Sequence, residues 1–172
     1  ISRDHTLLID PSGLITITGG KWTTYRKMAE DTIDEASVVA GLDERPSATE
    51  KLRLHGWLKN TKSMAPFELY GSDAPHLKKI CEEISGGEEK LHPDLPYRKA
   101  EVVWAARHEM ARTVEDVLAR RTRSLFLNAR ASKEMAPEVA SLMAFELGLS
   151  KEWQNSQIEK FTKQADGYLL TS

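Results

Sequence analysis

The sequence predicts a mainly α-helical protein that begins with a β-hairpin and one helix and continues as a compact all-α domain. Two short β-rich runs separated by a turn predict the hairpin, and helical periodicity recurs through most of the remaining chain. The chain has 172 residues, of which 40% are apolar and 29% charged, so its composition is that of an ordinary globular protein. This length allows one domain plus an appendage.

The N-terminal 42 residues carry the hairpin and the first helix. The β-rich runs are Thr6 to Ile9 and Leu14 to Thr18, and the residues between them, Asp10 to Gly13, preset or tolerate turn dihedrals. From Tyr25, apolar residues recur at i, i+3 and i+4 until Gly41, where a helix is expected to end. We therefore expect a hairpin followed by a helix of about four turns.

Residues 43–69 are predicted to be a linker, because they are polar and contain Pro46, Gly56 and Pro66. The following region, residues 70–168, is predicted to form an all-helical C-terminal domain. Helical patterns there cover roughly residues 75–84, 97–111, 114–121, 129–147 and 150–165.

Capping residues mark the joints of this helical region. Thr113 to Asp116, with the sequence TVED, is close to a capping box, and Asn128 and Ser150 are suited to cap the next helices. Pro137 is predicted to kink or divide its helix, and Gly148 to end it. The short connections predict antiparallel or steeply crossed neighbours.

Charge and cysteine content exclude several classes of protein. The net charge of −2 gives no general attraction to nucleic acid, and the lone Cys81 excludes an intrachain disulfide framework or a CxxC metal site. Apolar runs are too short to span a bilayer, and we predict no metal site. Since the chain starts at Ile1 within a pattern typical of a sheet, we interpret it as a piece of a longer protein.

The strand-to-helix junction at Gly19-Gly20-Lys21 is the strongest candidate site. Adjacent glycines permit unusual dihedrals and close approach of a ligand, and the helix start at Trp22 to Thr24 offers free N–H groups. With Lys21 beside it, this place suits a phosphate, a carboxylate or the N1–C2=O edge of a reduced flavin. A plain turn with tight packing is the alternative, and the spacing does not match a P-loop.

Three strings extend this pattern into a family resemblance. They are SRDH at residues 2–5, LITITGGKWTTYRKMAEDTIDEA at residues 14–36, and EVVWAARHEMARTVEDVLARRTRSLFLNARASKEMAPEVASLMAFELG at residues 101–148. Together they resemble FAD-dependent glycerol-3-phosphate dehydrogenases and the related α-glycerophosphate oxidases. The resemblance implies that residues 1–42 are the C-terminal end of the FAD- and substrate-binding domain, and residues 70–168 the helical domain that follows it.

The resemblance also implies a reaction and its partners. The parent enzyme would oxidise sn-glycerol 3-phosphate to dihydroxyacetone phosphate with FAD and pass electrons to a quinone. It would be cytoplasmic and peripheral on the cytoplasmic membrane, and this portion would contact its own N-terminal FAD domain. Because no GxGxxG follows a strand here, we expect this chain alone neither to bind FAD nor to catalyse. We expect no nucleic-acid partner.

Site residues are carried over from the family by position. The resemblance places Arg3 at the substrate phosphate and Lys21 beside flavin and substrate. Without the resemblance, we would interpret Arg3 as an exposed surface residue. Threonines at the helix start serve capping alone in the alternative interpretation. No catalytic base is assigned, because the histidines are scattered, and His5 stands where some members have tyrosine. The expected cofactor-binding residues are Gly19, Gly20, Lys21, Trp22, Thr23 and Thr24.

An arginine-rich segment, residues 98–130, is less informative. It has eight basic against four acidic residues, with Arg120, Arg121 and Arg123 nearly consecutive. Interleaved acids favour ion pairs within the domain over nucleic-acid binding, and docking against the FAD domain is a further alternative. Two alternative functions also stay open: an oxidase that reduces oxygen, and a non-catalytic helical interaction module.

Overall fold

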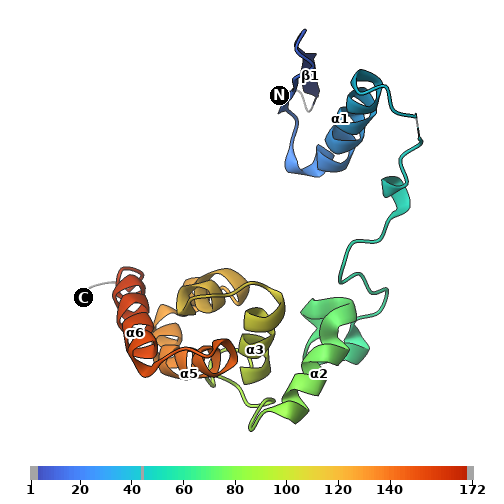
Figure 1. Ribbon diagram of the computed structural model, residues 1–172. Coiled ribbons are helices and arrows are strands. Elements are labelled where there is room, and N and C mark those ends of the chain that lie inside the picture. The colour runs from blue at the N-terminus through green and yellow to red at the C-terminus, as the bar shows by residue number, and fades with distance from the viewer. Residues whose placement is uncertain (1–3, 44, 170–172) are drawn as a thin grey trace. The chain divides into compact units, whose positions relative to one another are not determined.

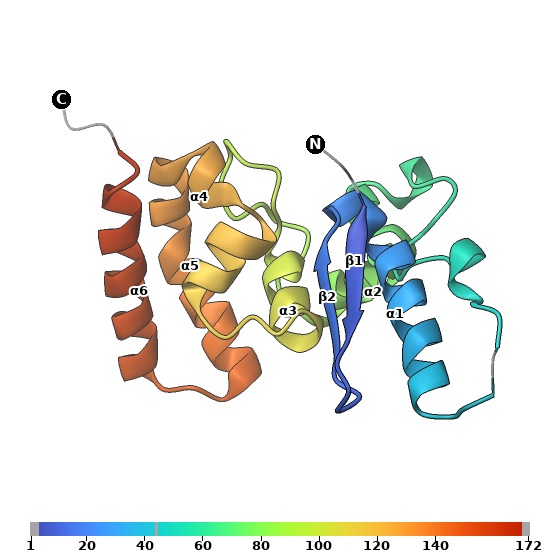
Figure 2. The same cartoon turned by 90° about the horizontal axis from the view of Figure 1, so that it is seen from above.

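The computed structural model describes residues 4–43 and 45–169, and these fold as two compact units that divide between residues 55 and 56 (Figures 1 and 2). The hairpin and the first helix form the first unit, and the second unit is helical. The division falls inside the segment that the sequence marks as polar and rich in turn residues.

The first unit is built on an antiparallel hairpin. Strand β1 (His5–Ile9) pairs with β2 (Ile15–Gly19), with Leu7 opposite Ile17. The turn closes because the Gly13 N–H donates to the Asp10 carbonyl at 2.8 Å and the Ser12 N–H to the Asp10 carboxylate at 2.9 Å. A short 3₁₀ turn, η1 (Trp22–Thr24), leads directly into α1 (Tyr25–Val39), and η2 (Thr49–Lys51) follows it.

This first unit has very little core. Alternate hairpin side chains, among them Leu7 and Ile17, are half-buried, but none of the described residues 4–55 is fully buried. Large apolar side chains are instead exposed on the strands, on α1 and on the segment after it: Leu8, Ile9, Leu14, Trp22, Tyr25, Ile33, Val38, Val39, Leu42, Leu52 and Leu54. Exposed apolar surface on this scale is typical of a face that another protein surface covers.

The second unit contains the fully buried core of the described chain. Its order of elements begins with 3₁₀ turns and continues with helices, of which α2 and α3 are separated by residues 84–98 and the later ones by short connections. These elements are η3 (Lys62–Met64), η4 (Glu68–Asp73), α2 (Ala74–Glu83), α3 (Lys99–His108), η5 (Asp116–Arg121), α4 (Ser124–Leu127), α5 (Ala129–Leu147) and α6 (Lys151–Asp166).

Helix α3 contributes to both hydrophobic clusters of this unit. Val102 and Ala105 belong to the larger cluster, where α5 packs against α6 on one side and against α3 on the other (Figure 2). Val103 and Trp104 belong to the smaller cluster, which includes residues of η4 and α2. The unit is therefore a layered helical domain with α3 between two cores.

Most helices and caps agree with the sequence-based expectation. Asn128 Oδ1 accepts the Ala131 N–H at 3.0 Å, and Ser150 Oγ accepts the Trp153 N–H at 3.3 Å. Thr113 and Asp116 form the expected reciprocal pair, since the Asp116 N–H donates to Thr113 Oγ1 at 3.1 Å and the Thr113 N–H to Asp116 Oδ2 at 2.9 Å. These contacts join residues three positions apart, which is why the local sequence pattern could predict them.

Two details of this unit refine the expectation. Of the two outcomes expected at Pro137, a kink or a division of the helix, division is excluded, because α5 runs unbroken from Ala129 to Leu147. Fully buried neighbours on both sides, such as Met135 and Val139, hold the helix although Pro137 has no N–H to donate. The segment 114–121 ends as a π-helical turn, η5, and the short α4 that follows was not predicted. A helix of four residues is too short to give a periodic signal.

The larger core predicts a sharp contrast between two residues of α5. Met143 is 0% exposed and Phe145 is 84% exposed. We expect Met143→Ala to lower the free energy of unfolding by about 2 to 5 kcal/mol, because it leaves a cavity. Phe145→Ala, the matched control, should change it by no more than about 0.5 kcal/mol. Urea denaturation followed by circular dichroism measures both, and equal losses would contradict this assignment of the core.

Candidate functional site

The candidate site is the turn between β2 and α1. Both glycines have positive φ, 82° at Gly19 and 69° at Gly20, which side-chain-bearing residues rarely adopt. The Gly20 N–H donates to the Asp4 carbonyl at 3.0 Å, which holds the turn against the start of β1. A Cβ on Gly19 would lie 3.0 Å from the same carbonyl oxygen. The sequence therefore needs glycine here for a backbone reason.

Thr24 closes the turn from the other side. Its Oγ1 accepts the Lys21 N–H at 2.9 Å and donates to the Lys21 carbonyl at 2.9 Å, while its own N–H donates to that carbonyl at 2.9 Å. The Lys21 N–H is therefore occupied. As in the first turn of any helix, the N–H groups of Trp22 and Thr23 have no carbonyl one turn earlier to bind. Thr24 is thus the third-position partner in a capping box whose N-cap is Lys21.

The side chains at this turn face solvent. Lys21, Trp22 and Thr23 are exposed, and Trp22 is 86% exposed with its ring stacked on Tyr25 at a centroid distance of 5.5 Å. Gly19, Gly20 and residues 21–24 follow one another through the end of β2 and η1, so they share this one turn. Arg3, the expected phosphate ligand, lies outside the described residues. An ammonium group beside backbone N–H groups at a helix start is suited to hold an anion.

One side-chain contact joins α1 to the hairpin, and ion pairs within α1 surround it. His5 Nε2 lies 3.0 Å from Asp31 Oδ2, and Lys27 Nζ lies 2.8 Å from both Asp31 Oδ1 and Glu30 Oε1. Glu30 also pairs with Arg26. Hydrogen bonds from Arg26 and Lys27 lower the pKa of Glu30 to about 2, and the two carboxylates raise the pKa of Lys27. His5, to which the sequence gave no role, therefore joins β1 to α1.

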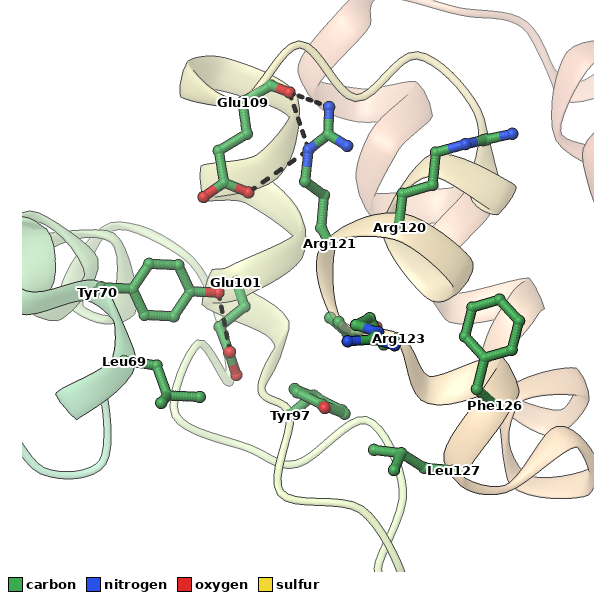
Figure 3. A pocket seen from close by; sticks show the side chains of 11 residues that line it. Leu69, Tyr70, Tyr97, Glu101, Glu109, Arg120, Arg121, Arg123, Phe126 and Leu127 are labelled. Carbon is green, nitrogen blue, oxygen red and sulfur yellow. Dashed lines mark hydrogen bonds and ion pairs between the residues drawn. The ribbon is translucent and has the colours of Figure 1, made fainter. Parts of the chain in front are cut away.

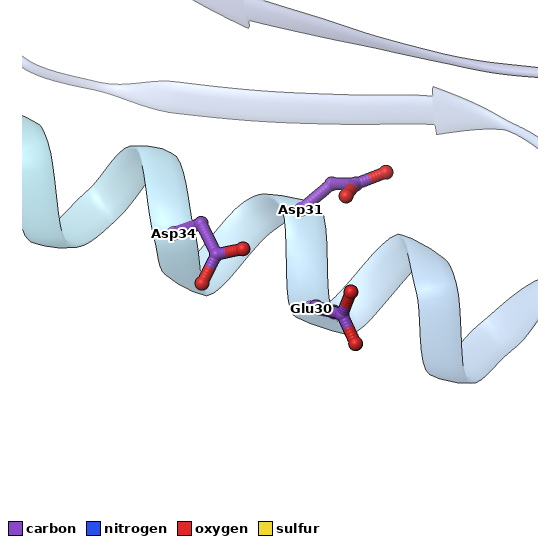
Figure 4. A group of neighbouring side chains, drawn as sticks. All are labelled: Glu30, Asp31 and Asp34. Carbon is purple, nitrogen blue, oxygen red and sulfur yellow. The ribbon is translucent and has the colours of Figure 1, made fainter. Parts of the chain in front are cut away.

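These ion pairs account for an acidic group on α1. Carboxylate oxygens of Glu30, Asp31 and Asp34 lie within 4.8 Å of one another, and Asp31 is directed toward the strands (Figure 4). Since Arg26 and Lys27 compensate the charge of the first two, ion pairing explains the cluster.

Ion pairing also explains part of the arginine-rich segment, as expected. Arg120 contacts Glu115 Oε1 at 2.6 Å and Asp116 Oδ1 at 2.7 Å, and Arg121 Nε donates to the Glu109 carbonyl at 3.0 Å. These contacts confirm intradomain pairing for two of the three clustered arginines. Arg121 binds the Glu109 carbonyl at the C-terminal end of α3, where a cation is favourable.

Comparison with known proteins gives consistent matches along the chain. Residues 14–154 match the family model described as the C-terminal domain of alpha-glycerophosphate oxidase. The chain is 39% identical to the probable mitochondrial glycerol-3-phosphate dehydrogenase of Caenorhabditis elegans, covering 93% of this chain and 25% of that protein. It is 36% identical to the mitochondrial glycerol-3-phosphate dehydrogenase of Mus musculus, covering 95% of this chain and 25% of that protein.

A solved structure is also similar. The glycerol-3-phosphate dehydrogenase of Bacillus halodurans, complexed with FAD, superposes with a TM-score of 0.69 at 27% identity. The match covers 97% of this chain and 39% of that one. The chain thus spans about a quarter of the length of the relatives named above.

The turn geometry predicts different effects for two glycine substitutions of equal backbone strain. A methyl on Gly20 would collide with Met28 Sδ and lie 3.2 Å from Thr24 Oγ1, whereas Gly41, with φ of 64°, has no atom within 4 Å of its Cβ position. We expect Gly20→Ala to speed amide exchange at Lys21 and Thr24 by roughly tenfold, because strain and collision together open the turn. Gly41→Ala should leave those amides unchanged, and similar exchange in both variants would refute the packing argument.

Proposed function

The chain belongs to the family defined by the C-terminal domain of alpha-glycerophosphate oxidase, and on that basis we propose that it is the C-terminal portion of an FAD-dependent glycerol-3-phosphate dehydrogenase. The parent enzyme oxidises sn-glycerol 3-phosphate to dihydroxyacetone phosphate. The observation that carries the proposal is the Gly19–Thr24 turn, which combines a double-glycine bend, an exposed lysine and a helix start.

The residues of the turn fit the anionic edge of a flavin. FAD, when bound, supplies the acceptor for the hydride that leaves C2 of the substrate. The exposed ammonium of Lys21 and the N–H groups of Trp22 and Thr23 would be the donors that face negative charge on the bound flavin. Because Thr24 and Asp4 hold the backbone in place, these donors are preorganised before the charge develops.

Substrate recognition is assigned to two cations of the first unit. We propose that Arg3 holds the phosphate of the substrate and that Lys21 lies beside both flavin and substrate. A guanidinium suits phosphate, because its planar fork donates two parallel hydrogen bonds. No residue of this chain is assigned as the catalytic base.

The burial pattern supports assigning two parts of this chain to two different domains of the parent. We propose that residues 1–42 complete the FAD-binding domain and that residues 70–168 form the helical domain, joined by residues 43–69. The exposed apolar residues of the hairpin and α1, such as Leu8 and Ile33, supply the face that packs against the rest of the FAD domain. On this proposal the chain alone neither retains FAD nor catalyses.

Quinone is the proposed electron acceptor, and an oxidase that reduces oxygen is the alternative. Among residues 4–43 and 45–169, no helix combines the length and the apolar character needed to cross a membrane. We propose that the parent is cytoplasmic and attaches peripherally to the cytoplasmic membrane that holds the quinone. The names of two relatives suggest the mitochondrial membrane as the alternative site of attachment. Fractionation of cells measures which membrane carries the parent protein.

The reaction is tested in the parent protein under anaerobic conditions. We expect glycerol 3-phosphate, but not glycerol, to bleach the flavin absorbance, because only the former carries the group that Arg3 holds. A quinone analogue should then restore the colour faster than oxygen does. Faster recovery with oxygen and formation of peroxide would identify the oxidase. A parent without flavin would instead favour a non-catalytic helical module.

Two variants of the parent should separate binding from chemistry. Arg3→Ala should weaken binding of glycerol 3-phosphate by roughly 2 to 4 kcal/mol, and Arg3→Lys should recover only part of it. Lys21→Ala should lower kcat more than it lowers FAD content, because it removes charge at the reacting centre. Steady-state kinetics and flavin quantitation measure both. A Lys21→Ala protein that lacks FAD altogether, or an Arg3→Ala protein with normal KM, would overturn the respective assignment.

A further inference from the structure

A cavity of about 620 Å³ opens on the helical unit between η4, the start of α3 and the segment from η5 to α4 (Figure 3). Its walls include Tyr97 and Glu101 on one side and Arg121, Arg123 and Phe126 on the other. A volume of this size is typical of small-molecule sites.

The backbone of one wall is irregular where it enters the cavity. In the π-helical turn η5, the Val117 carbonyl accepts both the N–H and the hydroxyl of Thr122, each at 2.9 Å. Arg123 follows with φ of 58°, and among the described non-glycine residues only Met110 shares a positive φ. Such irregularities are maintained against strain and are frequent at functional sites. Here they set the direction of the Arg123 side chain.

Arg123 keeps its donors free in a region where the other arginines are occupied. It makes no hydrogen bond or ion pair with any residue in 4–43 or 45–169, whereas Arg120 binds two carboxylates and Arg121 binds the Glu109 carbonyl. Arg121 uses Nε and Nη2 for that contact, which leaves Nη1 available. In Figure 3, Arg123 lies between Arg121 and the ring of Tyr97. Two guanidinium groups therefore offer N–H donors to the same space.

Two acidic residues line the α3 wall, and both already have partners within the chain. Glu109 Oε1 accepts the Trp104 Nε1–H at 3.1 Å, and its Oε2 lies 3.8 Å from Arg121 Nε. Glu101 is 8% exposed and accepts the Tyr70 hydroxyl at 3.0 Å and the Arg98 N–H at 2.6 Å. It is therefore held in place on the α3 wall and does not pair with Arg123. Each carboxylate oxygen keeps a second lone pair, and Tyr97 adds a half-buried phenol to the same wall. This wall is suited to hydroxyl groups.

We propose that this cavity binds a small organic oxyanion, whose phosphate or carboxylate is held by Arg123 and Arg121 and whose hydroxyl-bearing body lies against Tyr97 and Glu101. Planar guanidinium groups bind either kind of oxyanion through paired N–H donors, which is why both are included. The inference concerns the helical unit and does not depend on the proposed function.

The test is an NMR titration of the 172-residue chain with glycerol 3-phosphate, with glycerate as the carboxylate probe and with neutral glycerol. Saturable shifts at the amides of residues 97–101 and 120–127 are expected with at least one anion, and none with glycerol. The anion that binds more tightly identifies the preferred group. Arg123→Gly should weaken that binding at least about tenfold. Arg130→Gln, which removes an exposed arginine from α5, should leave the affinity unchanged.

Arg123→Gly also separates binding from folding. Glycine adopts a positive φ without strain, so this variant should have an equal or higher Tm while losing the anion. Three results would overturn the proposal: no saturable shift in the wild-type chain, equal affinity in the wild type and Arg123→Gly, or equal loss in Arg123→Gly and Arg130→Gln. If the wild-type chain binds no anion and Arg123→Gly loosens the helical domain in the parent, the arginine serves interdomain docking instead.

Discussion

The burial of the central stretch of α3, residues 100–106, is the constraint on which the helical unit depends. All seven residues from Ala100 to Ala106 are buried, so the helix has no solvent-facing side in this stretch. Such a helix needs small residues wherever a neighbour approaches closely, and three of the seven are alanines. Its one large side chain, Trp104, lies in the smaller core and donates Nε1–H to Glu109 at 3.1 Å. The two cores are therefore joined through one element.

Hydrogen bonds explain why a charged residue is tolerated in the buried stretch of α3. Glu101 stands at the third position of the helix, where its carboxylate receives the Arg98 N–H, and the Tyr70 hydroxyl comes from the smaller core. Desolvation raises the pKa of Glu101 despite these donors. At the C-terminal end of α3, Arg121 donates a hydrogen bond to the Glu109 carbonyl. The positions of Glu101 and Arg121 in the cavity thus follow from how the two ends of α3 are capped.

The first unit is held by local hydrogen bonds and not by a buried core. Its turn is held by contacts within a few residues or across one hairpin, such as those between Thr24 and Lys21 and between Gly20 and Asp4. Its apolar side chains remain exposed, since a hairpin and one helix have too few layers to enclose them. Local hydrogen bonds can therefore shape the turn in this chain, while the proposed chemistry requires the remainder of a larger domain.

The sequence by itself determined the features whose physical cause is local. Turn residues Asp10 to Gly13 define the hairpin, Thr113 and Asp116 cap each other over three positions, and the specific string around Gly19-Gly20-Lys21 identified the family. Tertiary structure alone decided the pairing of His5 with Asp31, the continuity of α5 through Pro137 and the free guanidinium of Arg123 in its cavity. These depend on residues far apart in the chain, whose packing outweighs local preference and leaves no periodic signal to read.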